Sequence, residues 1–176
     1  LGAGFLKSHP NLDAPDIQFH VQPFSKSNMS NAAPDSFSAF TASVLQLRPE
    51  STGQLRLRSA DMREYPSLQP NYLATENDQR TLVEGIRVAR KISRFEPLSQ
   101  FVTAEEAPGP QLPDEDYDGL LDWARNTAST IFHPTGTCKM GSDPMAVVDE
   151  RLRVHGITGL RVADCSIMPK IISGNT

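Results

Sequence analysis

Cysteine is scarce in this chain, whose 176 residues include only 2 Cys, 1 Trp and 3 Tyr. Two cysteines are too few for the network of disulfides that stabilises small secreted domains. No apolar run approaches the ~20 residues that a helix needs to cross a bilayer. Lys and Arg number 17 against 21 Asp and Glu, a formal net charge of −4. The composition therefore excludes a disulfide scaffold and a membrane-spanning helix, and it argues against a basic nucleic-acid-binding surface.

Proline is more frequent than glycine, with 14 Pro against 11 Gly, which predicts much irregular connecting chain. The length corresponds to one domain or to part of one. The chain starts at Leu1 and stops at Ser173-Gly174-Asn175-Thr176, directly after a strongly patterned stretch. Neither end resembles a natural terminus, so we expect a fragment of a longer protein.

Three segments have the pattern of strands. Apolar and polar residues alternate over Ile17–Gln22, which predicts a half-buried strand. Val44–Leu47 and Leu55–Arg58 follow, and the Pro/Gly turn between them predicts that they pair as antiparallel strands. Residues 25–43 are rich in Ser, Asn and Ala without a clear period. We expect a long surface excursion there, and loops of that length often act as lids.

Two helices are predicted downstream. Thr75–Asp78 resembles a capping box, and the helix that it begins ends before Pro97. The cations of Arg87–Arg94 suit the C-terminal half of this helix, where we expect them on a solvated face. A second helix is expected over Pro113–Asn126, after an irregular Pro-rich linker. Together these patterns predict an α+β fold, a mainly antiparallel sheet with helices packed on it. The expected apolar faces comprise Leu82, Val83, Ile86, Ala89 and Ile92 in the first helix, and Tyr117, Leu120, Leu121 and Ala124 in the second.

The residue types that can do chemistry concentrate after residue 126. His133 lies between an apolar run and a loop rich in Pro and Gly, which is a good position for a reactive side chain. A hydrogen-bonded structural histidine is the alternative. His133 and Cys138 could bind a metal, but with no second ligand pair the zinc signal is weak, and we expect no metal. Leu160–Ser166 is expected to be a short buried strand ending in polar residues, as at ligand-binding sheet edges.

Other candidates are weaker. Gly2-Ala3-Gly4 lacks the third glycine of a nucleotide-binding fingerprint, because Lys7 stands there, and no strand precedes it. No Gly-x-Ser-x-Gly nucleophile elbow occurs. His20 lies on the polar side of its strand and could face a substrate, although a structural role is favoured. His155 precedes a glycine turn and is expected to be structural. We expect Cys138 and Cys165 to be reduced thiols in a cytoplasmic protein, with a disulfide between them as the alternative.

Several longer motifs occur in a fixed order. HPTGTCKMG is followed by VVDERLRVHGITGLRVADCSIMP and SGNT, and is preceded by LRPESTGQLRLRSAD, PNYLATENDQRTLVEGIRVARKI and DWARNTAST. This series resembles the C-terminal part of the glucose–methanol–choline (GMC) oxidoreductases, nearest to their choline dehydrogenase-like branch. The resemblance covers about residues 44–176. It is far more specific than any single short motif.

The resemblance implies an FAD-dependent oxidation of an alcohol to an aldehyde or ketone. It implies that His133 is the base that takes the hydroxyl proton while hydride passes from the alcohol carbon to flavin N5. The family's second active-site residue, a His or Asn, is expected just beyond residue 176. Cys165 stands where relatives usually have Ala. The residues that are expected to approach FAD are Ala163, Asp164, Cys165, Asn175 and Thr176.

The resemblance also implies how the chain is divided. Residues 1–130 are expected to form the substrate-binding domain, and residues 131–176 the histidine loop and a segment that returns to the FAD-binding domain. The N-terminal FAD domain lies outside this chain and is its expected partner, together with a small-molecule alcohol. The alternative is a non-catalytic binding or scaffold domain that has kept the substrate-side fold.

Overall fold

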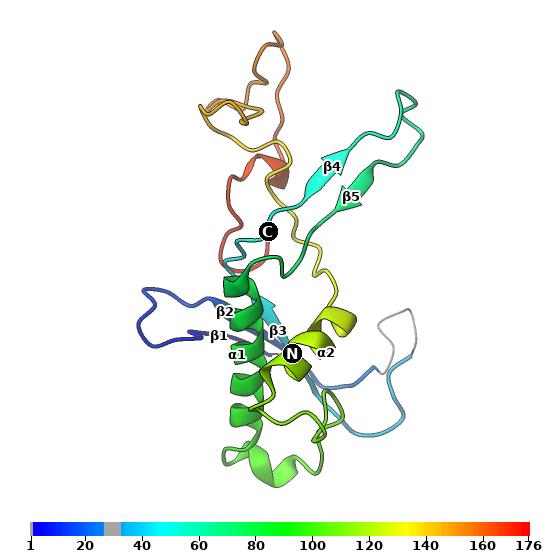
Figure 1. Cartoon of the computed structure of the whole chain (residues 1–176), viewed down its shortest axis with the longest axis vertical. Coiled ribbons are helices and arrows are strands. Elements are labelled where there is room, and N and C mark those ends of the chain that lie inside the picture. The colour runs from blue at the N-terminus through cyan, green and yellow to red at the C-terminus, as the bar shows by residue number, and fades with distance from the viewer. Residues whose placement is uncertain (1, 27–32) are drawn as a thin grey trace. The chain divides into compact units, whose positions relative to one another are not determined.

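Two compact units make up the chain, which is described here by a computed structural model over residues 2–26 and 33–176. Unit 1 comprises Leu1–Leu47 and Glu76–Ala128, and unit 2 comprises Arg48–Thr75 and Ser129–Thr176. Figure 1 traces their elements along the chain. Residues 27–32 of the expected surface excursion lie outside the described residues, so its role as a lid stays a prediction.

The sheet of unit 1 has three antiparallel strands in the order β1-β2-β3. These are β1 (Gly2–Leu6), β2 (Ile17–Gln22) and β3 (Thr41–Gln46), with Ile17 opposite Gln46 in the register. The predicted strand at residues 17–22 is confirmed, whereas β1 was not predicted. Because the N-terminal glycines lie within β1, they form no nucleotide-binding turn.

The expected pairing of residues 44–47 with residues 55–58 is wrong. In unit 2, β4 (Gln54–Arg56) pairs instead with β5 (Ser67–Gln69), which was not predicted. Side chains reinforce this hairpin, since Gln54 Nε2 donates to Gln69 Oε1 at 2.7 Å. The alternation in the sequence indicated extended chain correctly but carried no information about the partner strand. β3 pairs with β2 over six residues instead.

The long helix α1 (Glu76–Ser93) packs on β3 and β2 of the same unit. Val83 and Ile86 are buried, as expected, but Ile92 is 42% exposed, so the apolar face ends before the helix does. Asp78 is also buried and accepts a hydrogen bond from Gln46 Nε2 at 2.7 Å. The N-terminal half of α1 is thus joined to the sheet by a buried polar contact as well as by apolar packing.

Gly85 lies where α1 approaches the sheet most closely. A Cβ atom at this position would lie 2.2 Å from Val44 Cγ1. We expect Gly85→Ala to lower the stability of the full-length protein by ~1–3 kcal/mol through overpacking, which outweighs the ~1 kcal/mol gain in helix propensity. Urea unfolding measures this, with the exposed Lys91→Ala as a control that should change little. A stabilised Gly85→Ala variant would contradict the packing described here.

The second helix, α2 (Tyr117–Thr127), begins four residues later than the sequence predicted. Asp116 is its N-cap and accepts a hydrogen bond from the backbone N–H of Gly119 at 2.9 Å. Residues 113–116 form a turn before it, closed by the Asp116 N–H donating to the Pro113 carbonyl at 3.1 Å. The expected apolar face is confirmed, because Leu120, Leu121 and Ala124 are buried.

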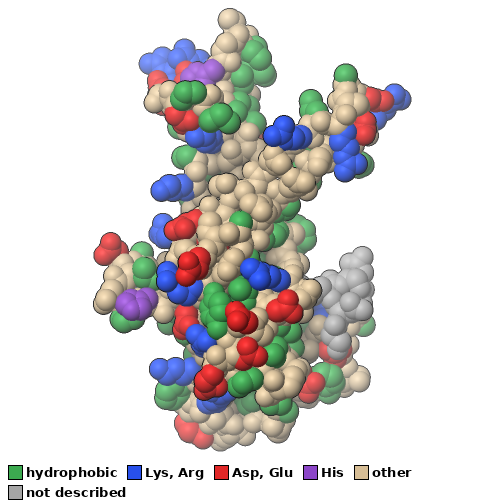
Figure 2. Space-filling model, viewed as in Figure 1, with side chains coloured by type: hydrophobic (Ala, Val, Ile, Leu, Met, Phe, Trp, Pro, Cys, Tyr) green, Lys and Arg blue, Asp and Glu red, His purple; other side chains and the backbone are tan. Residues whose placement is uncertain are grey.

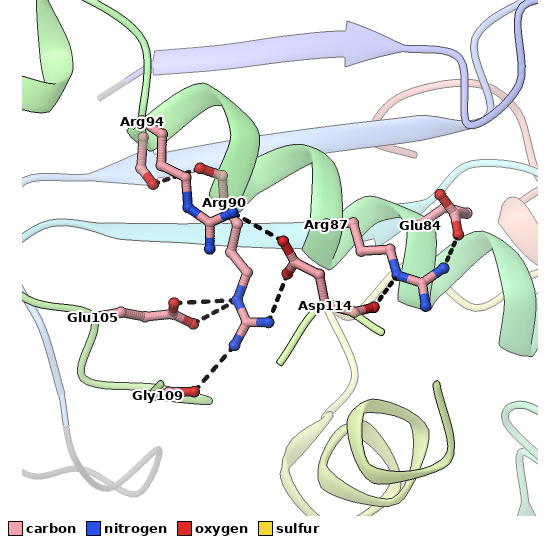
Figure 3. Close-up of polar contacts among 8 residues, drawn as sticks. Glu84, Arg87, Arg90, Arg94, Glu105, Gly109 and Asp114 are labelled. Atoms are coloured by element: carbon pink, nitrogen blue, oxygen red, sulfur yellow. Dashed lines mark hydrogen bonds and ion pairs between the residues drawn. The ribbon is translucent and has the colours of Figure 1, made fainter. Parts of the chain in front are cut away.

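Arg90 corrects the expectation of a solvated basic face on α1, because its side chain is only 6% exposed. Its guanidinium donates to the Glu105 carboxylate at 2.9 and 3.1 Å, to Asp114 Oδ1 at 2.8 Å and to the Gly109 carbonyl at 3.1 Å. Figure 3 shows these acceptors arranged around the guanidinium. The periodicity suggested a surface cation because it could not show that the linker after the helix folds back over α1.

Asp114 is shared between two arginines of α1, since its second oxygen accepts from Arg94 at 2.9 Å. Partial burial by itself would raise the pKa of Asp114, but the hydrogen bonds from Arg90 and Arg94 outweigh it and hold the pKa below the ordinary value. The carboxylate is therefore ionised at neutral pH. It fastens the segment before α2 to the C-terminal half of α1.

The surface shows charges of both signs. On the face drawn in Figure 2, Lys and Arg side chains are interspersed with Asp and Glu side chains. Among the described residues, no helix combines the length and the apolar character that crossing a membrane requires.

Candidate functional site

His133 has partners at both ring nitrogens, and all of them come from the last two residues of the chain. The Asn175 carboxamide nitrogen lies 2.9 Å from Nε2. The Thr176 hydroxyl lies 3.0 Å from Nδ1, and the Thr176 backbone N–H donates to the same nitrogen at 3.2 Å. The imidazole is half-buried. Residues more than forty positions apart in sequence thus converge on the one histidine that the sequence singled out.

The identity of these neighbours constrains the proton on the ring. A neutral imidazole has one donor and one acceptor nitrogen. The Thr176 N–H can only donate, which favours an unprotonated Nδ1 and a proton on Nε2. The Asn175 carboxamide can present its oxygen or its nitrogen by rotation, and the Thr176 hydroxyl can donate or accept. These two side chains can therefore adapt to either tautomer, whereas the Thr176 backbone N–H fits only an unprotonated Nδ1.

Backbone geometry turns the terminal segment toward His133. Gly174 has a φ of +96°, a conformation that is strained for other residues, and it separates Ser173 from Asn175. Ser173 accepts a hydrogen bond from Arg48 Nη2 at 2.8 Å. The segment is therefore held at Ser173 by Arg48 and at its last two residues by His133.

A short backbone ladder supports the loop that follows His133. The Cys138 N–H donates to the Ser166 carbonyl at 2.9 Å, and the Met140 N–H donates to the Ile167 carbonyl at 2.8 Å. Val148 is fully buried in this unit. The ladder brings the region around residue 165 beside the loop, although the two segments are distant in sequence.

The expectation of a buried strand over Leu160–Ser166 is wrong. Only an isolated bridge joins Arg161 to Arg153, and Leu160 is 48% exposed. The segment then turns into the 3-10 helix η2 (Cys165–Ile167). Its apolar residues suggested burial, but turns at residues 156 and 159, both glycines with positive φ, prevent a continuous ladder from forming.

Asp164 caps η2, since its Oδ1 accepts the Ser166 N–H at 2.8 Å. The hydroxyl and the backbone N–H of Ser166 lower the pKa of Asp164. The side chain thus has a structural task. The adjacent Ala163 is exposed, and its backbone N–H and C=O form no hydrogen bond within the described residues. This part of the segment can offer backbone groups to a ligand.

Asp149 organises the neighbouring loop. It accepts from Arg153 Nε at 2.7 Å and from the backbone N–H groups of Arg151 and Arg153 at 2.9 and 3.0 Å. These hydrogen bonds lower the pKa of Asp149 to about 2, and the bond from the Arg153 side chain contributes most. The loop therefore keeps its charged anchor down to strongly acidic pH, and loses it only as the pH falls toward 2.

His155 and His20 have hydrogen-bonding partners of their own. His155 Nε2 lies 3.1 Å from the Gly141 carbonyl, which supports a structural role. His20 belongs to unit 1 and pairs with Gln18 at 2.8 Å. Sequence reasoning missed Arg48, which the resemblance covers but to which no motif gave a role. Of the expected flavin-facing residues, the structure places Asn175 and Thr176 at His133.

Two other kinds of site were considered. The described residues contain no group of three or more His, Cys, Asp or Glu that could hold a metal ion, and both cysteines are free thiols. A surface hollow of about 420 Å³ in unit 1 is lined by Arg87, Lys91, Arg94, Phe95 and Asp114. Arg87 and Arg94 there already pair with Glu84 and Asp114, so these two cations are engaged within the protein.

Comparisons with known proteins give one consistent result. The sequence profile of a family described as GMC oxidoreductase matches residues 49–176. The chain is 42% identical over 174 residues to an oxygen-dependent choline dehydrogenase of Serratia proteamaculans, covering 98% of this chain and 30% of that protein. It is 37% identical to an alcohol dehydrogenase [acceptor] of Pseudomonas putida, covering 98% and 31%. The crystal structure of a pyridoxine 4-oxidase from Mesorbium loti superposes with a TM-score of 0.86 at 27% identity, covering 98% of this chain and 34% of that one.

Proposed function

Because the chain belongs to the GMC oxidoreductase family, in the part that corresponds to the C-terminal region of its choline dehydrogenase-like members, we propose that it supplies the base of an FAD-dependent alcohol oxidoreductase. The chain spans about 30% of the length of the curated relatives that it matches. We assign the substrate side and the histidine loop to it, the dinucleotide cradle to the N-terminal FAD domain, and the enzyme to the cytoplasm. The observation that carries the proposal is the convergence of Asn175 and Thr176 on His133.

The chemistry requires a proton acceptor. Hydride leaves the carbinol carbon readily only when the hydroxyl oxygen gives up its proton. We assign the acceptor role to the His133 imidazole, because the Thr176 backbone N–H requires an acceptor nitrogen at Nδ1, and a ring with an acceptor nitrogen is the form that can take up a proton. Their hydrogen bonds also hold the ring in one orientation, which reduces the entropy lost when substrate binds.

Residues of this chain fit a flavin neighbour. The exposed Ala163 backbone can donate and accept hydrogen bonds, while the Asp164 side chain is occupied in capping η2. We therefore expect residues 163–165 to contact FAD through backbone groups, and Asn175 and Thr176 to lie at the border between flavin and base. FAD, when bound, supplies the hydride acceptor. Flavin reduction by an alcohol in the full-length protein, with and without His133, tests the proposal.

The isolated 176-residue chain should bind FAD weakly or not at all. The helix N-terminus and glycine-rich turn that anchor a pyrophosphate have no counterpart in the described fold, where the N-terminal glycines lie in β1. Titration of the purified chain with FAD, followed by flavin fluorescence, measures this, with the full-length protein as the positive control. Stoichiometric FAD that co-purifies with the isolated chain would contradict the prediction.

A further inference from the structure

We propose that Arg48 is a positioning residue for the base. It holds the segment of residues 173–176 in the conformation that brings hydrogen-bonding groups to His133. This inference rests on the proposed function, because it gives Arg48 a role only if His133 takes the proton. Arg48 itself is not assigned any contact with substrate.

The contact is direct and short, since Arg48 Nη2 donates to Ser173 Oγ at 2.8 Å. It is the one hydrogen bond or ion pair that Arg48 makes within the described residues. An exposed arginine is ordinarily free to remain in solvent or to pair with a carboxylate. Here the guanidinium donates to a neutral serine hydroxyl instead. The bond therefore fixes the position of Ser173 and neutralises no charge.

The backbone close to Arg48 is itself held by hydrogen bonds within unit 2. Just beyond Arg48, the Ser51 hydroxyl accepts from the backbone N–H groups of Ala74 and Thr75 at 2.9 and 3.3 Å. The Asn71 side chain donates to the Thr52 carbonyl at 3.1 Å. These bonds join the two ends of the segment that carries the β4–β5 hairpin. Arg48 therefore reaches Ser173 from a fixed point of unit 2.

Ser173 lies close in sequence to the two residues that contact His133. Only Gly174 lies between Ser173 and Asn175, and its positive φ reverses the local direction of the chain. Movement of Ser173 is transmitted through this single residue to both partners of His133. A glycine linker has little intrinsic preference for one conformation. A restraint on its far side is what selects the conformation that places Asn175 and Thr176.

The test compares variants of the full-length flavoprotein, including the Arg48→Met/Ser173→Ala double variant and His133→Ala. Arg48→Met removes the donors but keeps an unbranched apolar stem, and Ser173→Ala removes the acceptor. Arg48→Lys restores one donor group. Arg56→Met is the matched control, because Arg56 in β4 donates to Gln54 at 2.8 Å and, within the described residues, makes no hydrogen bond or ion pair with residues 173–176. For each variant, bound FAD, thermal midpoint and the anaerobic rate of flavin reduction are measured against alcohol concentration and pH.

We expect Arg48→Met and Ser173→Ala to lower the limiting rate of flavin reduction about 10- to 100-fold, since a displacement of ~1 Å can cost that much. The substrate concentration for half-maximal rate and the FAD content should change little. The pH profile of the rate should differ from that of the wild type, because the groups around the proposed base are displaced. The double variant should be no slower than either single variant, and Arg48→Lys should recover part of the rate.

The outcomes separate this inference from the function on which it rests. Wild-type reduction rates and pH profiles in Ser173→Ala would overturn the role of the Arg48–Ser173 bond, even if Arg48→Met does not fold. A loss of rate as large in Arg56→Met would overturn it as well. If the flavin of His133→Ala is reduced at the wild-type rate, the proposed function is wrong, and the role of Arg48 that rests on it is wrong as well. A slow His133→Ala beside unaffected Arg48 and Ser173 variants rejects the positioning role alone.

Discussion

His133→Ala in the full-length protein should slow flavin reduction by alcohol ~10²–10⁴-fold while leaving most FAD bound. A positioned general base typically accelerates the reaction by a factor of that size. FAD should remain bound because His133 contacts the protein through Asn175 and Thr176, at the border of the expected flavin site. Anaerobic stopped-flow measurement of the flavin absorbance gives the rate, and the FAD content gives the second readout.

His155→Ala is the matched control for this experiment. His155 lies in the same unit, with its Nε2 3.1 Å from the Gly141 carbonyl, and it has no part in the proposed chemistry. We expect it to keep the reduction rate. Loss of FAD together with activity in His133→Ala would assign the side chain to cofactor support. An unchanged rate would favour the alternative of a non-catalytic binding or scaffold domain.

Arg90→Met should lower the stability of the full-length protein by about 3–5 kcal/mol. Removing one partner of a buried ion pair leaves the other charge uncompensated. Here Glu105 loses its arginine, and Asp114 keeps only the more exposed Arg94. The segment between α1 and α2 should loosen, since these two residues fasten it to the helix. Denaturant unfolding measures the loss, and hydrogen exchange over residues 103–116 locates it.

Arg94→Ala is the control, because Arg94 pairs with the same carboxylate but its side chain is 64% exposed. An exposed ion pair stabilises the fold by ~1 kcal/mol or less.

The pH dependence of stability gives a further test of the Arg90–Asp114 pair. The pKa of Asp114 is lowered in the folded protein, so its stabilising effect is present above the unfolded pKa near 4 and is lost as the pH falls through the lower folded value. The difference in free energy of unfolding between wild type and Arg90→Met should narrow as the pH is lowered from 5 toward 3. A gap that widens would contradict this.

Local patterns predicted the elements of the fold well. The strand at residues 17–22 and the long helix were found within a few residues, because alternation and helical periodicity record which side chains face the core. Partner strands were not found, since pairing depends on where the chain returns. β1 and β5 are short and weakly patterned, and they supply the pairs that the sequence did not show. Arg90 was misplaced for the same reason, as its acceptors come from 15 and 24 residues downstream.

The candidate site shows the same division. His133 was singled out by its motif, and the resemblance named Asn175 and Thr176 without giving their contacts with His133. Their convergence depends on the positive φ of Gly174 and on the Arg48–Ser173 bond, which joins positions 125 residues apart. No local pattern contains such a contact. Only the folded chain shows that the three residues form one cluster.

The division of the chain has a consequence for synthesis on the ribosome. Neither unit is continuous, because the hairpin segment of residues 48–75 is separated from the rest of unit 2 by the helical part of unit 1. At translation rates of ~5–20 residues per second, that hairpin leaves the ribosome seconds before residues 129–176 are made. Meanwhile residues 48–75 are without the second half of their unit, and contacts such as the Arg48–Ser173 hydrogen bond cannot yet form. Unit 2 can therefore complete its fold only after residues 129–176 have left the ribosome.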